Sequence, residues 1–74
     1  MAYKSSTVGN FQIEQFVENQ IAYIQLGKMI IKNRLKTYIF STVFTGEPQA
    51  CNTVFSFLES QDYSVIKALW DSNL

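Results

Sequence analysis

The chain has 74 residues, of which 47% are hydrophobic and 16% are charged, and its formal net charge is zero. A chain of this length forms at most one domain. The high apolar content and the low charge exclude a disordered chain. The zero net charge argues against strong attraction of the whole molecule to nucleic acid or anionic lipid.

Residues that carry chemistry are scarce. The chain has no histidine and a single cysteine, Cys51, so an intrachain disulfide and the usual zinc ligand sets are excluded. Without a histidine as base, Cys51 is predicted to be a small buried residue rather than a nucleophile, although its reactivity stays open. The three glycines are isolated and form no phosphate-binding loop. We therefore expect no enzyme, no metal and no cofactor.

The N-terminal half favours a helix. Residues 1–9 are small and polar and are predicted to form an N-terminal arm, which leaves residues 10–74 as the single small domain. Asn10 is a suitable helix N-cap. Apolar residues then recur at helical spacing; they are Ile13, Phe16, Val17, Ile21, Ile24, Ile31 and Leu35. Gly27 either lies inside one long helix or ends a first one.

Residues 36–45 are ambiguous. They are rich in strand-forming residues, yet their apolar residues also repeat at helical spacing, and Gly46 follows where a helix-ending glycine would stand. We favour a helix because periodicity is usually the stronger signal. If the segment is a strand, either residues 20–31 or another copy of the chain must pair with it.

The last third predicts two helices. Pro48 suits the first turn of a helix whose apolar stripe is completed by Cys51 and Leu58. Residues 60–64 read as a break in which Asp62 or Ser64 serves as the next N-cap. A short final helix carries Trp70.

The predicted fold class is therefore mainly α, with three to four short helices around a small single-layer core. The alternative is an α+β fold in which residues 36–45 are a strand followed by two C-terminal helices. The longest candidate for a membrane span, residues 38–44, contains Ser41 and Thr42 and is much shorter than the roughly 18 apolar residues that a span needs. No membrane association is expected, and cytoplasm is the default compartment.

Four of the six cations lie close together, at Lys28, Lys32, Arg34 and Lys36. On a helix the three lysines would form one row, since they are spaced four residues apart. Such a row could follow a phosphate backbone. We favour a solvated edge that borders the apolar stripe, because lysine stems often cover apolar surface.

The aromatic content points to a partner. Eleven residues are Phe, Tyr or Trp, more than so small an interior readily holds. On a helical wheel Met29, Phe40 and Phe44 lie opposite the main apolar stripe, and a helix that is apolar on both sides is usually covered on both. We predict a partner interface made of these three residues and Trp70.

These patterns favour a non-enzymatic protein–protein interaction module, such as a regulator, inhibitor, adaptor or assembly subunit. It is expected to bind another protein or its own copies through the apolar patch, while the basic row steers the approach. The alternative function is a nucleic-acid binder in which a dimer uses the Lys28–Lys36 row.

Overall fold

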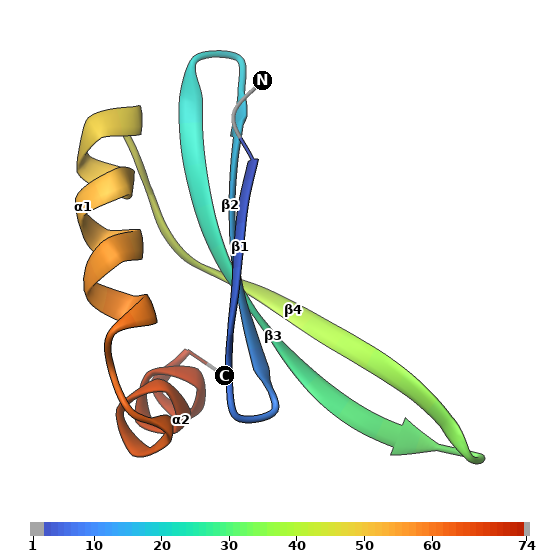
Figure 1. The fold of residues 1–74 in the computed structure, drawn as a ribbon. Helices are drawn as coiled ribbons and strands as arrows, with labels where there is room; N and C mark the ends of the chain where they lie inside the picture. The colour runs from blue at the N-terminus through green and yellow to red at the C-terminus, as the bar shows by residue number, and fades with distance from the viewer. Residues whose placement is uncertain (1–2, 74) are drawn as a thin grey trace.

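The computed structural model describes residues 3–73 and shows a four-stranded antiparallel sheet followed by two helices (Figure 1). The strands are β1 (Tyr3–Val8), β2 (Phe11–Glu18), β3 (Ile21–Lys32) and β4 (Leu35–Gly46), and they neighbour one another in chain order. The helices are α1 (Pro48–Glu59) and α2 (Tyr63–Ser72). Residues 1–2, at the start of the expected N-terminal arm, and residue 74 lie outside the described range.

The mainly α prediction is wrong, since residues 11–46 form strands and turns rather than helices. Residues 36–45 are part of β4, and β3 supplies the neighbouring strand, the pairing that the α+β alternative required. That alternative did not include β1 and β2. Asn10, expected to cap a helix, lies in the turn between them, and the expected polar arm forms β1 over Tyr3–Val8.

Two tight turns explain why strands form here. β2 and β3 are joined by Asn19 and Gln20, and β3 and β4 by Asn33 and Arg34. All four residues have positive φ values, between 52° and 68°. Two-residue loops with positive φ at both positions are type I′ turns, whose twist matches that of the flanking strands. The turns therefore set the register of both hairpins.

The core lies between the helices and one face of the sheet. Alternate residues of β2 and β3 point toward the helices, as the two-residue period of a strand requires. The buried apolar residues of the sheet are Phe11, Ile13, Ala22, Ile24 and Leu26, and those of the helices are Cys51, Phe55, Leu58, Ile66 and Trp70. Within residues 3–73, no element covers the opposite face of the sheet.

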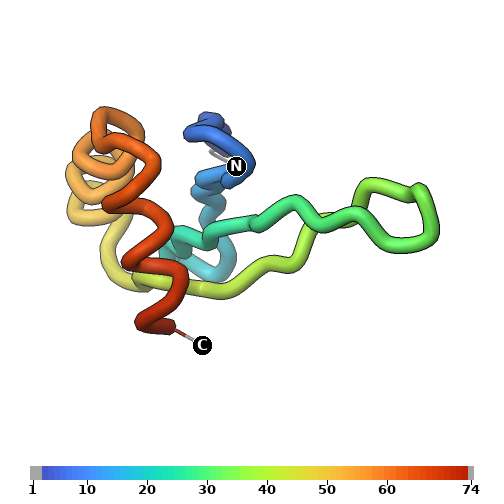
Figure 2. Tube along the Cα trace, turned by 90° about the horizontal axis from the view of Figure 1, so that it is seen from below, coloured from blue at the N-terminus to red at the C-terminus, as the bar shows by residue number. Residues whose placement is uncertain are grey.

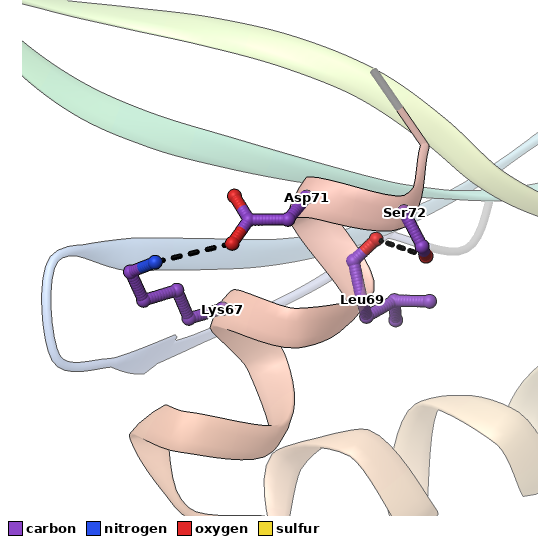
Figure 3. Close-up of polar contacts among 4 residues, drawn as sticks. All are labelled: Lys67, Leu69, Asp71 and Ser72. Atoms are coloured by element: carbon purple, nitrogen blue, oxygen red, sulfur yellow. Dashed lines mark hydrogen bonds and ion pairs between the residues drawn. The ribbon is translucent and has the colours of Figure 1, made fainter.

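The two helices begin as the sequence predicts. Pro48 occupies the first turn of α1, where its missing N–H costs no hydrogen bond. The Asp62 carboxylate caps α2 by accepting a hydrogen bond from the Val65 N–H at 3.1 Å. Farther along α2, Lys67 and Asp71 form an exposed ion pair at 3.1 Å, and the Ser72 hydroxyl donates to the Leu69 carbonyl (Figure 3). An exposed pair of this kind stabilises a helix only slightly.

The hairpin of β3 and β4 is longer than the rest of the sheet. Its far end projects away from the helices and from β1 and β2 (Figure 2). The register shifts between Ile24 and Gln25, so Val43 has no partner in β3. Such a β-bulge bends a strand and increases its twist. The bulge lies close to the point where the hairpin leaves the helices and extends into solvent.

Candidate interaction surface

The projecting part of the hairpin, residues 28–39, is called the hairpin extension below. Five residues on each strand at about 3.3 Å per residue give it a length of about 16 Å. Every residue from 31 to 40 is exposed, and residues 28–30 are half-buried. The exposed side chains include large apolar ones on both sides of the ribbon, among them Ile31, Leu35 and Ile39. The extension therefore lacks the cover that the helices give to the rest of the sheet.

The sheet also has an uncovered side along its whole length, called the open face below. It carries those residues of β2 and β3 that alternate with the buried ones. It also carries the β4 residues that pair with this exposed set. Its apolar members are Phe16, Ile21, Tyr23, Met29, Ile31, Tyr38 and Phe40. Phe16 stacks on Tyr23 with ring centroids 5.2 Å apart, and Tyr38 stacks on Phe40 at 6.1 Å.

Gly27 and Phe40 form the base of the hairpin extension. They are direct partners across β3 and β4, and the Phe40 ring lies over Gly27. A Cβ atom at position 27 would stand 2.4 Å from the nearest ring carbon. Because glycine has no side chain, the ring can cover the backbone here. Phe40 remains 42% exposed on its outer side.

The charges divide the molecule into two parts. Residues 19–46 contain four of the six cations and none of the six carboxylates, so the net charge of this segment is +4. The remainder has Lys4, Lys67 and all six carboxylates, which give −4. The zero total charge thus results from two opposite halves, and the positive half is mainly the hairpin extension.

On the open face, Glu14 and Glu18 lie at the end away from the extension. The Tyr3 hydroxyl donates a 2.8 Å hydrogen bond to the Glu14 carboxylate, and the Gln25 amide lies 3.4 Å from its other oxygen. The bond to Glu14 raises the pKa of the Tyr3 hydroxyl. The open face therefore has one acidic, aromatic end and one basic, aromatic end.

The predicted interface residues do not all lie on one surface. Met29 and Phe40 share the open face and are close to each other. Phe44 is half-buried and packs against the core beside its partner Ile24. Trp70 is 3% exposed and lies in the core, with its ring 5.8 Å from that of Phe11. Only the first two can belong to an exposed patch in this conformation.

The basic residues do not form the expected helical row, because residues 28–36 form a hairpin. Lys28 and Lys32 lie on the side of the extension that continues the helix-covered face. Lys36 pairs with Ile31 and lies on the open face, and Arg34 is in the turn. The four cations are therefore distributed along the extension, from Lys28 beside its base to Arg34 at its tip, instead of following one line.

Sequence reasoning missed Phe16, Tyr23, Tyr38 and Ile31 as members of one exposed surface. The missing information was the strand pairing, which brings Phe16 beside Tyr23 and Tyr38 beside Met29. The signal in the sequence was the pair of Asn-containing dipeptides at residues 19–20 and 33–34, each between runs of strand-forming residues.

Among residues 3–73, the core holds one polar side chain, Gln15, and one thiol, Cys51. The Gln15 amide, 1% exposed, donates to the Asn52 side-chain oxygen of α1 at 2.8 Å. Cys51 is buried, its thiol lies 3.4 Å from the Ala22 carbonyl oxygen, and burial raises its pKa. The arrangement suits packing, because a buried thiol with a raised pKa is a weak nucleophile.

Residues 3–73 contain no pocket and no group of three His, Cys, Asp or Glu residues that could hold a metal ion. Within the same range, neither helix is long and apolar enough to cross a membrane. Comparison of the chain with protein-family models, with curated proteins and with solved structures found no match.

Proposed function

We propose that the protein is a non-catalytic protein-interaction module whose contact surface is the open face together with the hairpin extension. Regulators, inhibitors, adaptors and assembly subunits act by this kind of steric binding. The observation that carries the proposal is the contrast within one sheet. Its helix-covered face has a closed core, whereas the open face holds Ile31, Tyr38 and Phe40 in solvent.

Three properties of this surface favour a protein partner. Aromatic residues and methionine are enriched at the centres of protein interfaces, where large rigid side chains bury area at low entropic cost. Stacked pairs such as Tyr38–Phe40 present a continuous apolar surface. The surrounding cations, Arg34 and Lys36, form the polar rim that steers approach and orientation. We place this activity in the cytoplasm, where a single reduced thiol is ordinary.

A matched pair of photocrosslinking variants tests the proposal. A benzophenone amino acid replaces Tyr38 on the extension in one variant and Phe57 on α1 in the other. Both are exposed aromatic residues, at 41% and 59%, so both variants are expected to fold. In cells that naturally produce the protein, irradiation should yield protein adducts from position 38 and few from position 57. Absence of protein adducts at position 38, or equal yields at both positions, would refute the proposal.

The charge division supports a second candidate function, binding to nucleic acid through the extension. Four cations around a narrow ribbon with two exposed aromatic rings could contact phosphates and stack on bases. The six carboxylates of the remaining chain oppose this function, since they repel the same phosphates. Titration of labelled DNA and RNA at low salt decides the matter, because binding through several phosphate contacts must weaken steeply as salt increases.

A further inference from the structure

We propose that the open face binds the open face of a second copy, related by a two-fold axis near Gly27 and Phe40. The hairpin extension of each copy then lies on the acidic, aromatic end of the other. This inference rests on the proposed function and names its partner. A two-fold interface is self-complementary, so the same surface supplies both sides of the contact.

The lengths of the strands place the axis. β3 and β4 each contain 12 residues, Ile21–Lys32 and Leu35–Gly46, and their middles fall at the Gly27–Phe40 pair. The axis lies in the plane between the two sheets and runs across the strands. A half-turn about it places the two long hairpins face to face over their full length, with their strands running in opposite directions. Because Tyr23 and Ile31 are each four residues from Gly27, each Tyr23 then faces Ile31 of the other copy.

The charges agree with this arrangement. Lys36 is level with Ile31, four residues beyond Gly27, whereas Glu14 and Glu18 are level with Gln25 and Ile21 on the other side of it. The half-turn therefore brings Lys36 of each copy to the level along the strands that lies between the two glutamates of the other. Lys36 is on β4 and the glutamates are on β2, so the opposite charges attract across about two strand spacings, or about 10 Å. It also sends the two cationic tips to opposite ends of the dimer, which keeps like charges apart.

The same charges distinguish a second copy from a nucleic acid. A polyanion on the open face would meet the cations of the extension, but it would also meet Glu14 and Glu18 on the same surface. A second copy presents its basic and acidic ends in the reverse order, so each end of the open face lies over the end of opposite charge. A standard interface, which buries about 800 Å² per partner, would need roughly one-sixth of the 4962 Å² surface of this chain.

Charge reversal tests the arrangement without disturbing the core. Lys36→Glu and Glu18→Lys alter exposed positions, and each replaces two symmetric attractions of the dimer by two repulsions. With each reversed long-range pair changing the dissociation constant by about twofold at low salt, each variant should dimerise about fourfold more weakly than the native chain. The dissociation constant is measured by sedimentation equilibrium.

Mixing the two variants is the decisive step. In a mixed dimer, the carboxylate introduced at position 36 of one chain lies on the same side of the axis as the ammonium group introduced at position 18 of the other, about two strand spacings away. The native Lys36 and Glu18 are related in the same way, so the mixture should dimerise more tightly than either variant alone. Failure of the mixture to recover would overturn the two-fold arrangement, and so would a native chain that remains monomeric at millimolar concentration.

An apolar pair of variants tests the face. Phe40→Ser on the open face should weaken the dimer more than about tenfold, whereas Ile39→Ser, its neighbour on the other side of the ribbon, should leave it unchanged. Equal loss in both variants would contradict the assignment. Binding of an oligonucleotide that competes with dimer formation would assign the face to nucleic acid instead. If position 38 yields protein adducts although the chain remains monomeric, the second-copy proposal is refuted and the proposed function is not.

Discussion

Gln20→Gly distinguishes the hairpin from a helix by the sign of its effect on stability. Gln20 has φ of +68° and is the second residue of the turn between β2 and β3. A residue with a Cβ atom pays about 1–2 kcal/mol in the left-handed region. Glycine avoids this strain but loses about 0.5–1 kcal/mol through its greater freedom in the unfolded chain. The variant should therefore gain about 0.5–1 kcal/mol in the free energy of unfolding.

For a domain of this size the gain corresponds to an increase of about 2–8 °C in the melting temperature. Urea unfolding followed by tryptophan fluorescence measures the free energy, at a protein concentration low enough to exclude association. Gln12→Gly is the matched control, because Gln12 lies within β2, where glycine should cost about 0.5–1 kcal/mol. If residue 20 were inside a helix, glycine there would also destabilise the protein. A loss of stability in both variants would refute the turn.

Three further predictions concern the core, the thiol and the helix cap. Trp70→Ala should lower the free energy of unfolding, measured by denaturant titration, by about 3–5 kcal/mol. Phe57→Ala on the exposed side of α1 should change it by less than about 0.5 kcal/mol, and similar losses in both variants would contradict the buried position of Trp70. Cys51 should react with a thiol reagent at about pH 8 only as fast as the protein unfolds, because the thiol is buried and its pKa is raised; labelling of the native protein as fast as in denaturant would show an open site. Hydrogen bonds from the Ser64 hydroxyl and the backbone lower the pKa of Asp62, so its pKa in the folded protein is below that in the unfolded chain. The stabilisation that the cap gives to the fold is therefore fully present above the unfolded value near 3.8 and is lost as the pH falls through the folded value. The stability difference between the native chain and Asp62→Asn should therefore shrink below about pH 4, and a pH-independent difference would contradict the cap.

The two C-terminal helices could be predicted because their signals are local. Pro48 at a first turn, a single apolar stripe and an acidic cap at Asp62 all act within a few residues. Such features do not depend on where the rest of the chain lies.

The strands could not be recognised by alternation, because β3 is apolar on both faces. Ala22, Ile24 and Leu26 face the core while Tyr23 and Met29 face solvent, so polar and apolar residues do not alternate along it. Apolar residues on both faces of a strand also match a helical period by coincidence. The turns were inconspicuous as well, since each lacks the Asn-Gly pair that marks most type I′ hairpins.

The predicted interface residues differ in where the fold places them. Met29 and Phe40 share the open face, although strand pairing rather than a helix brings them together, and their contact with a partner stays a prediction. Trp70 was wrongly predicted to be exposed. An apolar stripe shows which residues share one face of a helix, but it does not show whether the fold buries that face. Phe44 was misplaced for a related reason, since its position next to the core follows from its pairing with Ile24 beside the bulge.

Hydrogen exchange along β3 and β4 tests most directly whether another molecule shields the hairpin extension. In a lone chain, the amides of residues 28–39 lie outside the helix-covered core and should exchange quickly, while those of residues 22–26 exchange slowly. Mass spectrometry over a range of protein concentrations should show exchange in residues 28–39 becoming slower as concentration increases, with a smaller change in residues 22–26, which the core already protects. Exchange in the extension that stays equally fast from micromolar to millimolar concentration, and is not slowed by any protein that crosslinks to position 38, would contradict the account.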